Sequence, residues 1–442
     1  MEDKEKNMDT DVSETVQEQV EEHHHHHHHH SHHHRHKHKS SRSKKFSLRK
    51  LKKSFKKHKK IWIPILMFLL IAVVVLAILG VVDLMSAQEQ LPQQAQGIEG
   101  AVVITAPVFE SEQRLVNAAV DKIMSYEQYD QPAHVVLKEF EGSSRLDVGM
   151  PVKLRFSLNN KPADYTVEKI VVETADNNHF LDSWEFTLDA GATSVDLYNL
   201  KTDTQYYYRI HYWFTNGIVS SAGGTFRTAK TPRILSIGGV YNARDIGGWV
   251  TTDGKTIRQG LLYRGTELDG SVQAEYRITE DGRRVMLEQL GIQMDMDLRW
   301  SQDNPSGTHS LGESVRHIYF GVEAYTNIFL ENYQDAVRNV FSELAKEENY
   351  PIYMHCTYGR DRTGTIFALL EAVLGVDEEQ IWRDYQLSAL ENIYQDNISF
   401  GSFLEALRAK PGNTLQEKAE GYLLSIGVTA EEIAAIRAIY LG

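Results

Sequence analysis

The chain has 442 residues, of which 42% are hydrophobic and 24% charged, enough for two or three folded domains. Residues 1–60 are basic, with 16 Lys and Arg against 9 Asp and Glu, whereas the whole chain has a net charge of -13. An acidic bulk argues against nucleic acid as the main partner. The single cysteine, Cys356, excludes an intrachain disulfide framework and any cysteine-cluster metal site.

Residues 23–38 contain 13 histidines within the basic N-terminal segment. Imidazoles at this density can bind transition metals, but a disordered polar tract or an expression tag has the same composition. The sequence therefore predicts a disordered, His-rich and basic segment over residues 1–60, and the role of the histidines stays open.

Residues 61–82 form an apolar run of 22 residues without a charge. About 20 apolar residues span the hydrocarbon core as a helix, which predicts a single transmembrane helix. Residues 35–60 hold 14 Lys and Arg and no acid, so the positive-inside rule predicts a cytoplasmic N-terminus and an extracellular 83–442. A cleaved secretory signal is the alternative, although its basic region would be unusually long. We expect a single-pass cell-membrane protein with an uncleaved anchor.

Residues 83–132 are expected to form a stalk and a helix. Residues 86–100 are rich in Gln, Glu and Gly, which is typical of an extended connector. Apolar residues recur with helical spacing over 109–128, which predicts one amphipathic helix there.

Short alternating strands fill residues 133–232, beginning with HVVLKEF at 134–140. Their spacing predicts an antiparallel β-sandwich. The run from Leu200 to Tyr206 resembles the Leu-x-Pro-x-Thr-x-Tyr run of fibronectin type III domains, with Thr202 where proline is usual. The resemblance implies that Tyr206 hydrogen-bonds back to the backbone. The neighbouring aromatic residues either pack in the sheet or form a face for a surface ligand.

Strands and helices alternate over residues 233–442, which predicts an α/β domain with a central, mostly parallel sheet. The apolar runs at 294–300 and 351–356 fit buried parallel strands. The predicted fold class is therefore multidomain: a single N-terminal transmembrane helix, a fibronectin type III-like β-sandwich and this α/β domain. Its helices are expected at 326–346, 363–375, 378–394, 400–409, 414–425 and 429–440.

The segment MHCTYGRDRTG at 354–364 lies between a predicted strand and a predicted helix. A loop that leads into a helix N-terminus directs backbone N–H groups at one place, where the helix dipole adds positive potential, so it binds anions. These groups and Arg362 favour the thiolate form of Cys356. The five residues between Cys356 and Arg362 let the loop wrap a tetrahedral oxyanion, with the guanidinium on two of its oxygens.

The other residues of the loop are assigned by their chemistry. Gly359 and Gly364 permit close approach of the backbone, and the Thr363 hydroxyl can donate to the departing sulfur. Arg360 either contacts the substrate or is a solvated charge. A buried structural cysteine beside surface arginines is the alternative, and the strand–loop–helix context argues against it. The predicted phosphate-binding residues are Thr357, Tyr358, Gly359, Arg360 and Gly364.

The loop resembles the His-Cys-x-x-Gly-x-x-Arg-Thr-Gly signature of cysteine-dependent tyrosine and dual-specificity phosphatases. Residues 242–248, 262–265 and 297–299 resemble bacterial tyrosine phosphatases related to the mycobacterial secreted phosphatase B, and the similarity extends over 235–395. The group often has Lys where Arg360 stands, so the charge is kept but a forked guanidinium replaces an ammonium. The resemblance implies an α/β phosphatase domain, and some members of the group also accept phosphoinositides.

The loop residues predict a two-step hydrolysis of phosphomonoesters. The Cys356 thiolate displaces the leaving oxygen to give a phosphocysteine, which water then hydrolyses. Arg362 and the loop amides stabilise charge on the phosphoryl oxygens in both steps. No metal or other cofactor is expected, because the loop itself supplies the positive charge.

Three aspartates are candidates for the general acid that protonates the leaving oxygen. Asp361 ranks first, because it lies in the loop and the resemblance implies a catalytic aspartate there. Asp297, at the end of a predicted strand, ranks second. Asp245 ranks third, with an ion pair to an arginine as its alternative role. The residues predicted to support the site are His355, Arg244, Asp245 and Arg299.

These observations together predict a membrane-anchored phosphatase. Its expected partners are phosphorylated proteins, with phosphotyrosine foremost and phosphoserine, phosphothreonine or phosphoinositide lipids as further candidates, and a surface ligand for the β-sandwich. The alternative is a non-catalytic surface module that binds phosphoesters without hydrolysing them.

Overall fold

The structure is a computed structural model, and it describes residues 102–143, 145–304, 307, 309–392 and 396–442. The described residues belong to one unit, Pro92–Gly442. The predicted disordered segment, the predicted transmembrane helix at 61–82 and the predicted stalk at 86–100 lie outside the described residues.

The predicted membrane anchor requires a correction. Within the described ranges, no helix is both long and apolar enough to cross a bilayer. The longest helices in those ranges, α6 (Glu331–Leu344) and α7 (Asp361–Leu374), have 14 residues each, whereas a span needs about 20. The prediction of a single-pass membrane protein with an extracellular catalytic domain is therefore corrected to a chain without such a helix in its described residues, and it is not carried further.

The first part of the described chain is rich in strands. They form a four-stranded antiparallel sheet in the order β5-β4-β7-β8 and two separate pairs, β2-β6 and β1-β3. The predicted sandwich is therefore corrected to several small sheets, because β2, β3 and β6 have only four residues each and each belongs to a two-stranded pair separate from the four-stranded sheet. The strands are β1 (Val103–Thr105), β2 (Val152–Arg155), β3 (Ser157–Asn160), β4 (Val167–Ala175), β5 (Trp184–Asp189), β6 (Ser194–Leu197), β7 (Gln205–Phe214) and β8 (Val219–Arg227).

Strand β7 covers the core of this region with one face. Alternate residues from Tyr206 to Phe214 are buried and those between them are more exposed, as expected for a sheet with one face on a core. The Tyr206 hydroxyl accepts a hydrogen bond from the backbone N–H of Lys201 at 2.8 Å. The hydrogen bond that the resemblance implied is thus confirmed.

The helix predicted over 109–128 is shorter in the structure. Helix α3 spans Ala118–Ser125, and the Oδ1 of its N-cap Asn117 accepts from the N–H of Ala119 at 3.0 Å. Phe109 lies outside the helix and packs against Phe226 of β8, with 5.4 Å between ring centroids.

The strand predicted at 134–140 is also wrong. This segment forms α4 (Ala133–Val136) and a 3-10 turn. Its apolar residues join the same buried cluster as the helices of the C-terminal part, so tertiary packing outweighs its strand-like composition.

A mixed sheet forms the centre of the C-terminal part, in the order β12-β11-β13-β10-β9. Strands β10 to β13 run parallel to their neighbours, and β9 pairs antiparallel with β10. The strands predicted within 294–300 and 351–356 are present as buried parallel neighbours. Across the strand ends, His355 pairs with both Gly265 and Asp297. The strands are β9 (Arg244–Asp245), β10 (Leu262–Gly265), β11 (Met294–Asp297), β12 (Arg316–Tyr319) and β13 (Ile352–His355).

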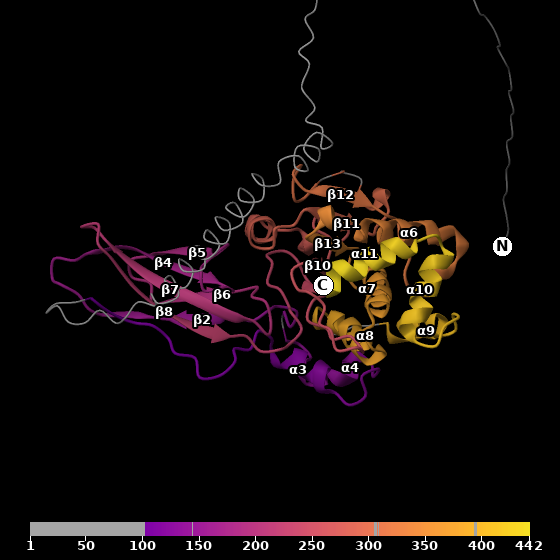
Figure 1. The fold of residues 1–442 in the computed structure, drawn as a ribbon, viewed down its shortest axis with the longest axis horizontal. Coiled ribbons are helices and arrows are strands. Elements are labelled where there is room, and N and C mark those ends of the chain that lie inside the picture. The colour runs from indigo at the N-terminus through magenta and orange to yellow at the C-terminus, as the bar shows by residue number, and fades with distance from the viewer. Residues whose placement is uncertain (1–101, 144, 305–306, 308, 393–395) are drawn as a thin grey trace, which may run out of the picture. The chain divides into compact units, whose positions relative to one another are not determined.

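Both faces of this sheet are covered. Ile352 and Met354 of β13 belong to the larger buried cluster, which they share with the helices, whereas Tyr353 belongs to a second cluster with Met286. Figure 1 shows the helices that follow β13, from α7 to α11, gathered beside the sheet. The loop that follows β13, residues 356–360, therefore starts from a strand that is buried on both sides.

The helices of this part follow the predictions with local differences. The helix expected over 326–346 is divided at Leu330 into a 3-10 helix, Tyr325–Phe329, and α6. Gly375 ends α7 with a φ of 89°, as its predicted role as a stop requires. The remaining helices are α5 (Glu280–Arg284), α8 (Glu378–Leu387), α9 (Asn397–Arg408), α10 (Leu415–Ser425) and α11 (Ala430–Leu441).

Candidate active site

Cys356 lies at the carboxyl end of β13, between that strand and α7. Its side chain is 3% exposed, and the loop of residues 356–360 leads directly into α7, which begins at Asp361. The first N–H groups of a helix have no partner within the helix, and the dipole is positive there, so this end attracts anions. A buried sulfur and the amino end of a long helix therefore meet at one edge of the sheet.

Two side chains anchor the carbonyl groups of this loop. Asn242 donates from its side-chain amide to the carbonyl oxygens of Tyr358 and Gly359, at 3.1 Å each. Arg264 donates to the carbonyl oxygen of Gly359 at 2.7 Å. A trans peptide points its C=O and the following N–H in opposite directions. Anchoring these carbonyls therefore turns the N–H groups of Gly359 and Arg360 to the other side of the loop.

Gly359 allows the loop to lie close to β10. Its φ is 61°, and a Cβ at this position would collide with the carbonyl oxygen of Gly265. The carbonyl oxygen of Thr357 accepts from the N–H of Glu267 at 3.0 Å. Within the described part of the chain, the N–H groups of Thr357, Tyr358 and Gly359 donate to no backbone carbonyl.

Arg362 lies in the first turn of α7 and contacts a carboxylate that sequence analysis missed. Its Nη1 is 3.4 Å from the Oδ2 of Asp303, which follows β11, and the two side chains are 28% and 30% exposed. A partly exposed pair at this distance is weak. The guanidinium is thus close to solvent and loosely held.

Asp361 is oriented by a tyrosine from a distant segment. The Tyr325 hydroxyl donates to the Oδ1 of Asp361 and lies 2.7 Å from the Tyr385 hydroxyl. Burial, followed by the nearby Tyr385 and Asp361, raises the pKa of Tyr325 far above its usual value. Tyr325 therefore stays a neutral hydroxyl that donates to the carboxylate. The Nε of Arg360 is 3.5 Å from the same Oδ1.

The remaining residues of the loop and of the first turn of α7 lie next to Asp361 and Arg362 in the chain. Thr363 is fully buried, and its Oγ1 has no hydrogen-bond partner among the residues that the structure describes. A Cβ on Gly364 would lie 3.0 Å from the Tyr385 ring, so this glycine allows α7 and α8 to approach closely. The guanidinium of Arg360 lies 5.2 Å from the centroid of the Tyr358 ring. The aromatic ring of Tyr358 and the cation of Arg360 thus lie side by side in the loop.

Asp297 lies beneath the loop, in a buried cluster of charges. It is fully buried, and its Oδ2 is 2.7 Å from the Nη2 of Arg299 and 3.8 Å from the Nε2 of His355. Burial alone would raise the pKa of Asp297, but His355, His317 and Arg299 outweigh this and hold it well below its usual value. Asp297 is therefore a permanent carboxylate.

Arg299 is held by three carboxylates. It binds Asp297, Asp269 at 2.8 Å, and Glu267. Burial lowers the pKa of Arg299, but hydrogen bonds with Asp297 and Asp269 raise it further than burial lowers it. Because the backbone N–H of Glu267 also binds the carbonyl of Thr357, this cluster supports the loop from below.

His355 connects the charged cluster with the cysteine. Its Nε2 is 3.0 Å from the Oδ1 of Asp295, and its Nδ1 is 3.0 Å from the carbonyl oxygen of Cys356. Burial lowers the pKa of His355, but Asp297 and Asp295 outweigh this effect and raise it to about 9. The imidazole is therefore positively charged at neutral pH, directly before Cys356 in the chain.

Arg244 and Asp245 are structural in this geometry. The Nε of Arg244 lies 2.9 Å from Asp384, which also binds Arg264 at 2.7 Å. Asp245 binds Arg233 at 2.8 Å and accepts hydrogen bonds from two backbone N–H groups. Arg244 thus acts on the site indirectly, through the shared Asp384 and through its hydrogen bond to Asn242.

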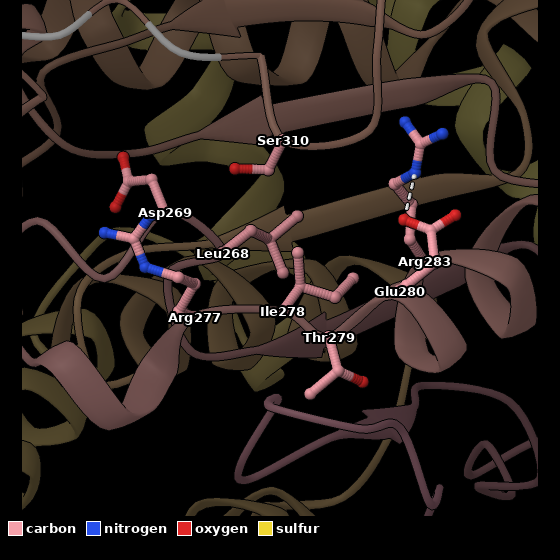
Figure 2. A pocket seen from close by; sticks show the side chains of 8 residues that line it. All are labelled: Leu268, Asp269, Arg277, Ile278, Thr279, Glu280, Arg283 and Ser310. Atoms are coloured by element: carbon pink, nitrogen blue, oxygen red, sulfur yellow. Dashed lines mark ion pairs between the residues drawn. The ribbon is translucent and has the colours of Figure 1, made fainter.

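A cavity of about 430 Å³ adjoins the Arg299 cluster (Figure 2). Its connection with the site is Asp269, whose carboxylate binds Arg299. Glu280 and Arg283 on its other side pair with each other at 3.5 Å. None of the site residues predicted from the sequence lines it. The lining residues are Leu268, Asp269, Arg277, Ile278, Thr279, Glu280, Arg283 and Ser310.

Residues 235–442 match the model of the Tyrosine phosphatase family. Residues 235–442 form a tyrosine phosphatase family domain. Together with the named relatives below, this match supports a protein-tyrosine-phosphatase-like hydrolase in this domain. The fibronectin type III-like assignment of 133–232 and the narrower likeness to the mycobacterial phosphatase stay predictions.

Two curated proteins are similar to the phosphatase domain. A tyrosine-protein phosphatase of Nostoc commune is 28% identical, over 36% of this chain and 69% of that protein. A candidate tyrosine-protein phosphatase of Cupriavidus necator is also 28% identical, over 36% of this chain and 64% of that protein. The similarity thus lies at the level of the domain.

Two solved structures of the Siw14 catalytic core also match, one of them the PP-IP phosphatase from S. cerevisiae with citrate. Their identities are 16% and 15%, and their TM-scores 0.22 and 0.23. They cover 32% and 30% of this chain, and 87% and 73% of their own chains.

Sequence analysis missed most of the residues that hold the loop. Glu267 and Asp269 follow β10, and Asp303 follows β11, so polar residues just after parallel strands are a signal that was available. Asn242 lies in the segment 242–248, which carries the resemblance to bacterial tyrosine phosphatases, but no role was predicted for it. Tyr325 has no comparable signal, because it reaches Asp361 from 36 residues away.

Proposed function

We propose that the phosphatase domain hydrolyses phosphomonoesters, chiefly phosphotyrosine in proteins, through a phosphocysteine at Cys356. The observation that carries this proposal is the loop after β13, where Asn242 and Arg264 bind the carbonyl groups of Tyr358 and Gly359 and so fix the direction of the N–H groups that follow them. The family match and the names of both relatives support it. Phosphoserine, phosphothreonine and phosphoinositides are the other substrates to compare.

The proposed reaction has two steps. First, the Cys356 thiolate attacks phosphorus, the bond to the ester oxygen breaks, and that oxygen takes a proton from Asp361. Next, the Asp361 carboxylate takes a proton from water, the water oxygen attacks phosphorus, and the S–P bond breaks to return the thiolate. Arg362 and the loop amides stabilise the phosphoryl charge throughout. The buried Thr363 hydroxyl, whose Oγ1 has no other partner within the described residues, donates to the sulfur.

Asp361 fits the role of general acid better than the other two aspartates. Its side chain is 30% exposed at the start of α7 and is oriented by Tyr325. Asp297 is fully buried and held ionised by its cationic neighbours, and Asp245 is committed to Arg233. We therefore assign Asp297 to support of the loop.

A trapping experiment tests the phosphocysteine directly. The full-length protein is mixed with a ³²P-labelled phosphotyrosine peptide, and the reaction is stopped in acid within the first turnover. We expect label on the wild type and none on C356S. Since the chain has one cysteine, label bound through a thiol can be attached only to Cys356. Tight peptide binding without turnover would overturn the proposal in favour of a non-catalytic binding module.

A substrate panel tests the proposed class. Initial rates are compared for phosphotyrosine, phosphoserine and phosphothreonine peptides and for phosphoinositide vesicles, all with C356S as the blank. We expect the phosphotyrosine peptide to give the highest kcat/KM. A higher value for the vesicles would move the assignment to lipid phosphate.

A further inference from the structure

Residues outside the matched phosphatase domain reach its catalytic loop. Residues 145–147 lie between the α4 region and β2. The helices just before them pack on the phosphatase domain: Arg383 of α8 donates to the carbonyl oxygen of Ile123 at 2.6 Å, and Gln386 donates to that of Gln131 at 2.7 Å. The apolar residues of α3 and α4 belong to the same buried cluster as α7 and α8.

Asp147 binds the backbone next to the catalytic loop. Its Oδ2 accepts from the N–H of Asn242 at 2.8 Å, and both residues are 3% exposed. Asn242 has a φ of 54°, in the left-handed region that asparagine adopts more readily than most residues other than glycine. The buried carboxylate stabilises this backbone position, because a buried N–H without a partner would be costly.

Asn242 passes this constraint on to the loop. Its side chain holds the carbonyl oxygens of Tyr358 and Gly359. These bonds fix the direction in which the N–H groups of Gly359 and Arg360 point. Two consecutive hydrogen bonds therefore connect Asp147 with the peptide groups whose N–H groups are proposed to bind the phosphoryl oxygens.

Arg145 provides a second connection from the same segment. Its Nε lies 3.1 Å from the Oδ1 of Asp147, and its guanidinium lies 3.9 Å from the centroid of the Tyr241 ring. Tyr241 packs on Tyr276 at 5.1 Å, and Tyr276 packs edge-on against Tyr358 at 5.9 Å. The Tyr358 ring is thus connected, through the rings of Tyr276 and Tyr241, with a residue from outside the domain.

We infer that Asp147 and Arg145 are positioning residues of the phosphatase reaction. Asp147 acts through Asn242 to orient the loop amides, and Arg145 acts through Tyr241 to orient the Tyr358 ring. This inference rests on the proposed function. It also means that a phosphatase domain cut at residue 235 lacks part of the support of its loop.

The test compares full-length variants with p-nitrophenyl phosphate as substrate and orthovanadate as a phosphate analogue. We expect D147A to lower kcat/KM and to weaken vanadate inhibition about tenfold each, because misdirected amides bind the oxyanion less well. The acid limb of the kcat/KM profile should also move up by about 0.5 pH unit, since the same amides stabilise the thiolate. D147N keeps an acceptor for Asn242 and should recover part of both losses.

The control variant is L154A, which removes a fully buried side chain from β2 in the other core. It should lower the melting temperature without moving the vanadate constant or the acid limb. R145A supplies a variant that folds even if D147A does not, since Arg145 is 39% exposed. We expect it to raise the KM of a phosphotyrosine peptide more than it lowers kcat.

The outcomes separate the inference from the proposed function. An inactive wild type would overturn the proposed function itself. An active wild type would overturn only the inference if D147A matched L154A in vanadate affinity and pH profile, or, where D147A does not fold, if R145A left the KM of the phosphotyrosine peptide unchanged.

Discussion

The Nη1 of Arg362 lies 3.4 Å from the Oδ2 of Asp303, which is 59 residues away in the sequence. The first residue is the proposed phosphate-binding cation, and the second follows the parallel strand β11. A partly exposed pair at this distance contributes at most about 1 kcal/mol, so a phosphoryl group can replace Asp303 on the guanidinium. The carboxylate then lies near a like-charged ligand.

The first prediction concerns this pair. We expect D303N to lower the KM of p-nitrophenyl phosphate about threefold by removing a like charge, with kcat nearly unchanged. D335N, on the exposed side of α6, is the control. An unchanged KM would contradict this prediction. Loss of kcat and of the basic limb of the pH profile would transfer the general-acid role from Asp361 to Asp303.

The second prediction tests Asp361 by the leaving group. We expect D361N to lower kcat/KM about 100-fold for phenyl phosphate, whose leaving oxygen needs a proton. The loss of kcat/KM should be much smaller for p-nitrophenyl phosphate, because nitrophenolate leaves without one. Equal losses of kcat/KM for both esters would show that Asp361 does not protonate the leaving oxygen.

The third prediction concerns the hydrogen bond from Tyr325 to Asp361. We expect Y325F to lower kcat for phenyl phosphate about fivefold with KM unchanged, because the carboxyl is less well oriented. Y333F on α6 is the matched control. In the double variant with D361N, Y325F should cause no further loss, because its effect passes through that carboxylate. Additive losses would contradict the proposed connection.

The fourth prediction follows from the pKa of His355, which is raised to about 9 from 6.5. A folded pKa above the unfolded one stabilises the protein fully below pH 6.5, and this contribution disappears as the pH rises through about 9. The free energy of unfolding should fall by up to about 3 kcal/mol over this range. Urea unfolding of H355Q should show a flatter dependence, whereas the exposed control H134Q should follow the wild type. Parallel curves for H355Q and the wild type would contradict a charged His355.

The fifth prediction compares two glycines with positive φ. Gly359, at 61°, has no room for a Cβ because of the Gly265 carbonyl, whereas Gly254, at 84°, has nothing within 4 Å of that position. We expect G254A to cost about 1 kcal/mol of stability and no activity. G359A should lose at least about 100-fold in kcat/KM, because the loop must move away from β10. Wild-type activity in G359A would show that the collision is relieved without moving the amides.

The sequence by itself determined which loop to expect as the site. Cys356, Arg362 and the glycines lie within one short segment between a predicted strand and a predicted helix, and this context, together with the spacing, predicts an anion-binding loop at a helix N-terminus. The buried strands at 294–297 and 352–355 were also predictable, since uninterrupted apolar runs are typical of parallel strands covered on both faces. The strand predicted at 134–140 failed because its apolar pattern fits a short helix equally well.

Tertiary structure decided what holds that loop. Asn242 reaches Gly359 from 117 residues away, and Asp147 reaches Asn242 from 95 residues away. Such hydrogen bonds depend on which strand ends and connectors meet in space, and no local periodicity records this. The proposed choice of Asp361 over Asp297 depends on contacts of the same kind, because His355, His317 and Arg299 keep Asp297 ionised against the effect of burial, whereas the sequence could only rank the two aspartates.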